Sequence, residues 1–354
     1  MSLPDGGRDT RKILLGTAAL GAAVTGVVLV LMVLRVSALQ VSGQSSLVRG
    51  FEHPKGAVEK MLATSDGQTI AALARDPTLS HPEVFNGHDF AYRAMRPAPE
   101  YLTWLLSLGH PGWVPGGMIA LAILSGGAIT AACAALFVRR NTAAQLGLLA
   151  AVLPGSLSSL RGLVPEAGGV ALATAGWLLA GDDNVWPGVA LMTAAGLWRE
   201  TLLVFPAVLA IMTVWRARSV RAAAPYAIPF VLFAGWVSFV RSRAGSWPWS
   251  STGGRLGIPF VGIAKDVSYW KNTAALEIAA IVVTAALIVL AVRRRDRSAP
   301  VMIGYGVLAT VLGVDVWHTW ADWGRVLLPL HLFGLVVLVS ARYGIRGTAR
   351  AERI

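Results

Sequence analysis

The run ILLGTAALGAAVTGVVLVLMVL, Ile13 to Leu34, has no charged side chain. The hydrocarbon core of a bilayer is about 30 Å thick, so a helix that crosses it needs about 20 mostly apolar residues. The run is too long for the apolar region of a signal peptide, and no obvious cleavage site follows it. We therefore predict an uncleaved first transmembrane helix.

The composition extends this prediction to the whole chain. Of its 354 residues, 55% are hydrophobic and 14% are charged, whereas soluble domains carry about 25% charged residues. We expect an all-α, polytopic bundle of about ten spans, or eight if two short central segments are not spans. The candidates are residues 13–35, 113–137, 143–160, 167–181, 185–198, 201–215, 222–240, 274–292, 299–317 and 326–341.

The net charge of +12 is explained by short basic clusters beside apolar segments. Ten alternating spans place about half of the 31 Lys and Arg on the same side as the N-terminus, and cytoplasmic loops are the ones enriched in Lys and Arg. We therefore predict a multi-pass protein of the cell (inner or plasma) membrane with both termini in the cytoplasm. Nucleic acid is not an expected partner, because the basic residues follow the membrane pattern.

The segment 38–112 then becomes a long extracytoplasmic loop. Its apolar residues Val58, Met61, Leu62, Ile70 and Leu73 recur at helical spacing, which favours short helices near the membrane interface. The chain has no internal repeat and no second soluble domain, so we expect one integral membrane domain over residues 1–354.

Two polar motifs in this loop are candidates for chemistry. Asp66 precedes Gly67, which marks a turn; the side chain either only supports that turn or acts as a general base above the membrane. Arg93 and Arg96 are three residues apart, on one face if helical. Guanidinium groups bind phosphate oxygens well, but the same pair also suits an anchor to lipid headgroups.

Charged residues recur at the outer ends of later spans. Glu166 starts one apolar segment, and Arg199 and Glu200 lie between two others. Asp322 and Arg325 stand near the start of the last span. Ionisable groups at membrane depth are usually paired or functional, so Glu166 with Arg199, and Arg325 with Asp322, are either ion pairs or members of a site.

One carboxylate with several arginines is the set that group transfer from a phosphate-linked donor requires. The acid accepts a proton from the acceptor, and the arginines stabilise charge on the departing phosphate. The single cysteine excludes an intramolecular disulfide, and no Cys/His pair has zinc-ligand spacing. No metal ligand set or cofactor is predicted with certainty; a divalent metal stays an open alternative.

The ordered motifs DGQ, ARDP, YRAMRP, PE, WRETLL and WADWGRVLLPL run along nearly the whole chain. In this order they resemble a bacterial family of multi-pass proteins of cell-surface glycopolymer formation. That family is similar to GT-C-type glycosyltransferases, including the GPI mannosyltransferase group. Where the family pattern has aromatic residues around DGQ, this chain has Ser65, Thr69 and Ile70.

The resemblance implies transfer of a sugar from a polyprenyl-phosphate donor to a cell-envelope glycan or glycolipid acceptor on the extracytoplasmic face, with inversion. It implies Asp66 as the catalytic base and Arg93, Arg96 and Arg325 as ligands of the donor phosphate. The alternatives are a transporter or flippase for lipid-linked glycans and a non-catalytic scaffold. The supporting residues that it implies are Gln68, Arg75, Asp76, Glu166, Arg199, Glu200 and Asp322.

Overall fold

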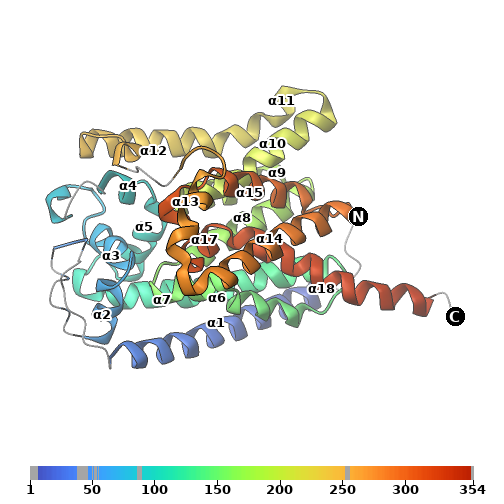
Figure 1. The fold of residues 1–354 in the computed structure, drawn as a ribbon, viewed down its shortest axis with the longest axis horizontal. Helices are drawn as coiled ribbons and strands as arrows, with labels where there is room; N and C mark the ends of the chain where they lie inside the picture. Colours follow the sequence, from blue (N-terminus) through green and yellow to red (C-terminus); the bar gives the residue numbers. More distant parts are fainter. Residues whose placement is uncertain are drawn as a thin grey trace. The chain divides into compact units, whose positions relative to one another are not determined.

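The computed structural model describes residues 7–37, 47–49, 51, 54, 56–85, 90–251 and 256–351, and these residues are predominantly helical (Figure 1). Within these ranges, extended pairing is limited to two isolated bridges, Val48 with Phe85 and Leu256 with Leu312. The all-α prediction is therefore confirmed for the described residues. Part of the predicted outer loop, including residues 38–46 and 86–89, lies outside them.

Five described helical segments are long and apolar enough to cross a membrane, or six if a pair bent by 77° counts as one span. Their length and composition indicate a membrane protein and coincide with six of the ten predicted spans. The five are Asp9–Val36, Pro111–Val138, Glu200–Ala217, Val220–Ala244 and Val261–Arg293; the bent pair is Trp320–Val326 with Leu328–Arg342.

The other four predicted spans form shorter elements. The 16-residue helix α8 (Glu166–Gly181) and the 14-residue helix α9 (Val185–Trp198) are about 24 and 21 Å long at 1.5 Å per residue. The segment at 143–160 is a 3-10 helix followed by a short α-helix, and that at 299–317 is broken in two. A total of ten or eight spans stays a prediction.

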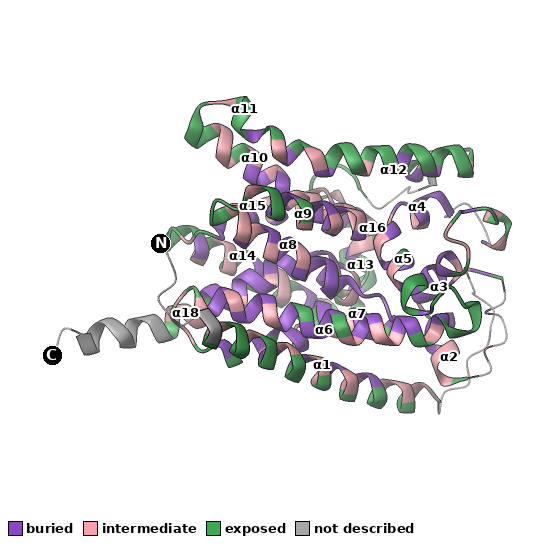
Figure 2. Ribbon diagram, turned by 180° about the vertical axis from the view of Figure 1, so that it is seen from behind, coloured by how far each residue is buried: buried purple, intermediate pink, exposed green. Residues whose placement is uncertain are grey.

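The surface of the long helices supports a lipid environment. In Figure 2 the helix α12 (Ile228–Ala244) is exposed along most of its length. Its Val231 is 66% exposed, and Val282 of α14 (Ala274–Arg293) is 60% exposed. Contiguous exposed apolar surface is unusual for a soluble monomer, whereas lipid chains cover it readily.

The chain divides into two compact units, each built from separated segments. The first comprises Met1–Ala23, Gly126–Ser156 and Gly254–Ile354, and the second comprises Val24–Ser125 and Leu157–Gly253. Three helices have residues in both: α1 (Gly7–Ser37), α6 (Val114–Val138) and α7 (Pro154–Arg161).

In the first unit, Glu277 of α14 accepts hydrogen bonds from the backbone N–H of Trp320 (2.9 Å) and from the indole Nε1 of Trp323 (2.8 Å). These bonds tie α14 to the short helix that begins the bent pair. The helices of this unit, besides the three shared ones, are η3 (Ala144–Val152), α13 (Val261–Trp270), η7 (Lys271–Thr273), α14, α15 (Ala299–Val311), α16 (Val314–Trp317), α17 (Trp320–Val326) and α18 (Leu328–Ala351).

In the second unit, α8 and α9 pack along each other (Figure 1). A Cβ on Gly188 would lie 2.8 Å from the carbonyl oxygen of Gly176, so glycine at these positions permits the close approach of the two backbones. The remaining elements of this unit are α2 (Ala57–Ala63), α3 (Gly67–Arg75), η1 (Pro82–Val84), α4 (Phe90–Ala94), α5 (Pro97–Leu106), η2 (Pro111–Trp113), η4 (Glu200–Leu203), α10 (Val204–Ala217), α11 (Val220–Ala223), η5 (Ala224–Ala227), α12 and η6 (Pro248–Ser251).

The helices expected in the outer loop are present as α2 and α3. Their apolar residues Met61, Leu62, Ile70 and Leu73 are buried in a hydrophobic cluster of the second unit. Burial of this face fixes the turn between α2 and α3, which carries the first candidate residue.

Candidate functional site

Asp66 lies in the turn between α2 and α3, as its position before Gly67 predicts. The Ser65 hydroxyl accepts a hydrogen bond from the Gly67 N–H at 3.1 Å. A Cβ on Gly67 would lie only 2.3 Å from the Gly162 carbonyl oxygen, so no larger residue fits without a backbone shift. The Asp66 carboxylate is thereby held next to the segment that leads into α8, with one third of its side chain exposed.

Arg93 is the ion-pair partner of Asp66. Its Nη1 atom lies 2.9 Å from Oδ1 of Asp66, and the Arg93 side chain is only 11% exposed. Arg93 is in the last turn of α4, whereas Arg96 follows that helix and precedes α5. The two arginines are therefore not on one helix, but both side chains line the same pocket.

Arg96 is held in a fork by Glu200, a residue 104 positions away. Its Nε donates to Oε2 at 2.8 Å and its Nη2 donates to Oε1 at 2.7 Å. The Tyr92 hydroxyl also accepts from Nη2, and the Tyr92 ring lies 4.7 Å from the guanidinium carbon. Burial alone would lower the pKa of Arg96, but Glu200 and Tyr92 outweigh it and raise this pKa, so the side chain stays a cation.

Glu166 and Arg199 form an ion pair, which was one of the two interpretations of the sequence. Glu166 opens α8, and Arg199 ends α9; Arg199 Nη1 contacts Glu166 Oε1. Both side chains are almost fully buried, and the Ser159 hydroxyl donates to the second Glu166 oxygen at 3.4 Å. This pair joins the two packed helices at one end.

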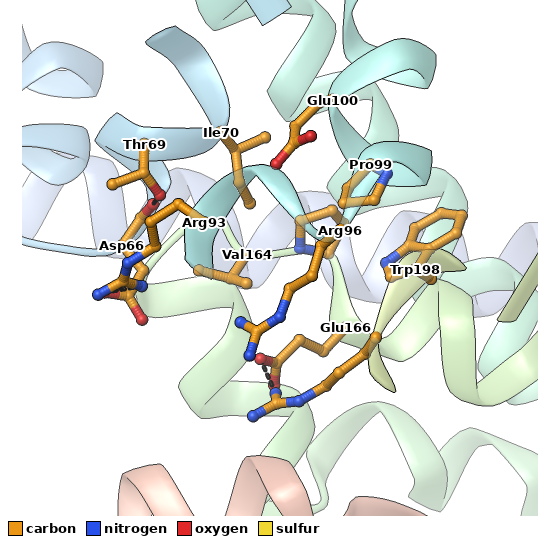
Figure 3. A pocket seen from close by; sticks show the side chains of 12 residues that line it. Asp66, Thr69, Ile70, Arg93, Arg96, Pro99, Glu100, Val164, Glu166 and Trp198 are labelled. Atoms are coloured by element: carbon orange, nitrogen blue, oxygen red, sulfur yellow. Dashed lines mark hydrogen bonds and ion pairs between the residues drawn. The ribbon is translucent and has the colours of Figure 1, made fainter. Parts of the chain in front are cut away.

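These side chains surround a small pocket of about 30 Å³ in the second unit (Figure 3). A cavity needs a volume of about 10–15 Å³ to hold one buried water, so the pocket has room for water but not for a sugar ring. Its lining combines apolar and charged groups: Asp66, Thr69, Ile70, Arg93, Arg96, Pro99, Glu100, Val164, Pro165, Glu166, Trp198 and Arg199.

Glu100 is a member of this site that the sequence reasoning missed. It is 4% exposed, and Figure 3 shows its carboxyl group turned towards Ile70 and Arg96. Burial raises the pKa of Glu100 well above its usual range, and the charge of Arg96 opposes this only in part. Its position three residues after the first residue of a Pro-led helix is a common place for Glu and so gave no separate signal.

The three predicted supporting residues of the outer loop lie outside the pocket lining. The Gln68 amide donates to the carbonyls of Ala63 and Ser65 at 3.2 Å each and accepts from the Val48 N–H at 3.2 Å. Asp76 ends α3, where its carboxylate accepts from the Thr78 hydroxyl at 2.9 Å and from the His81 N–H at 2.7 Å. The Arg75 guanidinium lies 5.4 Å from the ring centre of Phe51.

Arg325 and Asp322 belong to the first unit. They form an ion pair within α17 at 2.8 Å, which was the structural interpretation of their spacing. The Thr319 hydroxyl donates to Asp322 at 2.7 Å. These residues belong to the first unit and the pocket belongs to the second, and the phosphate role of Arg325 stays a prediction.

A larger cavity of about 600 Å³ lies in the first unit, between α14, α17 and α18. Its lining is almost entirely apolar; Thr284 and His331 are its polar members, 3.2 Å apart. The small pocket carries the acids and arginines that chemistry on a phosphate-linked sugar requires, and it is therefore the candidate site. Among the described residues, no group of three or more His, Cys, Asp or Glu is placed to hold a metal ion.

Comparison of the chain with protein-family models, with curated proteins and with solved structures gives no match.

Proposed function

We propose that the protein is an integral membrane glycosyltransferase of GT-C type. It moves a sugar from a polyprenyl-phosphate donor to a cell-envelope glycan or glycolipid acceptor on the extracytoplasmic face. The observation that carries the proposal is the partly exposed Asp66 carboxylate, 2.9 Å from Arg93 in a pocket that also holds Arg96. A proton acceptor beside two phosphate-binding side chains is the arrangement that such a transfer uses.

The ion pair between Asp66 and Arg93 suggests how donor binding and proton transfer are coupled. A donor phosphate that binds the Arg93 guanidinium would break the ion pair between Arg93 and Asp66. A carboxylate released from an arginine is a stronger proton acceptor. Asp66 then accepts the proton of the acceptor hydroxyl, whose oxygen attacks the anomeric carbon. The bond between that carbon and the phosphate oxygen breaks, and the configuration inverts.

The size of the pocket sets a condition on this mechanism. At about 30 Å³ it does not admit a sugar, so the donor must displace carboxylates from the arginines and widen the site. Asp66 and Arg93 are the pair to separate, because Asp66 is more exposed than Glu166 and Glu200, which hold the other two arginines. In this scheme Glu166, Arg199 and Glu200 support the pocket.

One specific observation favours a different class, the non-catalytic scaffold. Each arginine of the pocket has a carboxylate partner, and such fully paired clusters also lock helices together. The transporter alternative has no comparable support in the pocket. Activity separates the enzyme from both alternatives.

The experiment is sugar transfer in membranes that contain the wild type or Asp66→Asn at matched expression, with a panel of polyprenyl-phosphate donors. We expect transfer by the wild type and a loss of at least about 100-fold in the variant, since a general base contributes 10²–10⁴-fold. The control is Glu83→Gln, which removes an exposed carboxylate of the same loop and should leave the rate unchanged. Equal rates for Asp66→Asn and the wild type would remove Asp66 as the base; no transfer by any protein would favour the scaffold.

A further inference from the structure

Glu100 has an unusual environment for a carboxyl group. It follows Arg96 by four residues, in the first turn of α5. Pro97 and Pro99 lie in this turn, and proline has no N–H to donate. The helix start therefore offers the carboxylate fewer backbone donors than usual. Within the part of the chain that the structure describes, no hydrogen bond or ion pair of Glu100 is found, while Asp66, Glu166 and Glu200 each have an arginine partner.

The surroundings of Glu100 favour its neutral form. Ile70, Pro99 and Val164 are apolar members of the pocket lining, and the carboxyl group of Glu100 is turned towards Ile70 (Figure 3). Arg96 is the nearby cation that acts on Glu100, but its Nε and Nη2 donors are bonded to the two carboxylate oxygens of Glu200. A carboxylate buried without its own cation or donors is costly, so the group keeps its proton instead.

The charges around the pocket agree with a neutral Glu100. Three arginines, Arg93, Arg96 and Arg199, face three partner carboxylates, those of Asp66, Glu200 and Glu166. Apart from these residues and Glu100, no ionisable side chain lines the pocket. The helices α3 and α9 pack on α5, and their charged side chains are the exposed Arg75 and the terminal Arg199. With Glu100 protonated, the set is electrically balanced.

We infer that Glu100 is the general acid of the site, and that it delivers its proton to the oxygen of the departing phosphate. The inference rests on the proposed glycosyl transfer. The acceptor oxygen forms a bond to the anomeric carbon as the bond from that carbon to the phosphate oxygen breaks. The electron pair of the broken bond stays on the phosphate oxygen, which takes the proton of Glu100. The acceptor proton goes to Asp66, so one carboxyl group gains a proton and the other loses one.

The two carboxyl groups then have opposite roles that follow from their environments. Asp66 is partly exposed and paired, and is ionised before the reaction. Glu100 is buried, and its new negative charge arises beside Arg96. The phosphate oxygen gains negative charge as its bond to the anomeric carbon breaks, so it becomes a proton acceptor during the reaction.

The first test measures whether the Glu100 carboxyl group is protonated. Infrared spectra of the purified full-length protein, in the region of the protonated carboxyl C=O stretch, are compared at neutral pH for the wild type, Glu100→Gln and the control Glu83→Gln. We expect a protonated-carboxyl band in the wild type and in Glu83→Gln that loses intensity in Glu100→Gln. A band of equal intensity in all three would overturn the inference, because Glu100 would hold no proton to deliver.

The second test measures the rate of sugar transfer and its dependence on pH. Glutamine keeps the shape of Glu100 but has no carboxyl proton, so Glu100→Gln should lower transfer by about 10²–10⁴-fold. It should also abolish the fall in the wild-type rate as pH rises through the titration of Glu100. A donor whose phosphate leaving group is more acidic should recover most of the lost rate, which a merely structural defect would not allow. A variant with the wild-type rate and pH profile would overturn the inference.

The two tests separate this inference from the proposed function. Wild-type transfer that is lost in Asp66→Asn but kept in Glu100→Gln leaves the glycosyltransferase in place and removes Glu100 as its acid. Absence of transfer by the wild type removes both, whatever the infrared band shows.

Discussion

The ion pair between Glu166 and Arg199 allows a quantitative test of how the site is built. Replacing Arg199 by Met introduces an uncharged, unbranched side chain. Among the described residues, the Glu166 carboxylate, 7% exposed, then keeps the Ser159 hydroxyl at 3.4 Å. Breaking a buried pair from one side costs about 3–5 kcal/mol, because an uncompensated charge remains. We expect Arg199→Met to lower the free energy of unfolding by that amount.

The matched variants convert this expectation into a coupling energy. Glu166→Gln removes the charge that Arg199→Met leaves unpaired, so the double variant should be more stable than Arg199→Met alone. The interaction energy from the double-mutant cycle should exceed about 1 kcal/mol, above the range of exposed pairs. The exposed pair of His81 and Glu83 provides the control, and Glu83→Gln should cause no measurable change.

The assay is reversible unfolding in detergent, followed by tryptophan fluorescence, for the wild type, both single variants, the double variant and Glu83→Gln. Trp198 adjoins Arg199, lines the pocket and is one of the 13 tryptophans that contribute to the emission. A loss below about 1 kcal/mol for Arg199→Met, or an additive double variant, would refute the reasoning, because both results describe a solvated pair.

Two further predictions concern the packing and the protonation of the site. Gly67→Ala places a Cβ 2.3 Å from the Gly162 carbonyl oxygen and should lower the free energy of unfolding by about 1–3 kcal/mol. The control Gly116→Ala, in an open, exposed position of α6, should be neutral or slightly stabilising. Equal effects of the two variants on the unfolding midpoint would contradict the clash. Burial raises the pKa of Glu100 above its value in the unfolded chain, so the folded state binds more protons. Wild-type stability should therefore fall as pH rises from the unfolded-state pKa to the folded-state pKa of Glu100, by up to about 1.4 kcal/mol per pH unit. Glu100→Gln removes this dependence, so its stability relative to the wild type should rise with pH; parallel pH curves would show that Glu100 titrates normally.

The sequence by itself determined the class of the protein and the position of its long helices. Runs such as Ile13–Leu34 are sufficient for this, because the transfer of an apolar helix into a bilayer depends on its length and composition and hardly on its neighbours. Local signals also placed the turn at Asp66. The pairs Glu166 with Arg199 and Arg325 with Asp322 were among the sequence alternatives, because buried charges need partners.

Only the tertiary structure decided which charges share a pocket. Arg96 and Glu200 are 104 residues apart, and no local pattern links them. The structure also separated Gln68, Arg75 and Asp76, which hold turns and loops, from the residues that line the pocket. The protonation of Glu100 depends on what surrounds it: the same Glu on an exposed helix start would be ionised, and it is burial beside an arginine already held by Glu200 that makes it an acid.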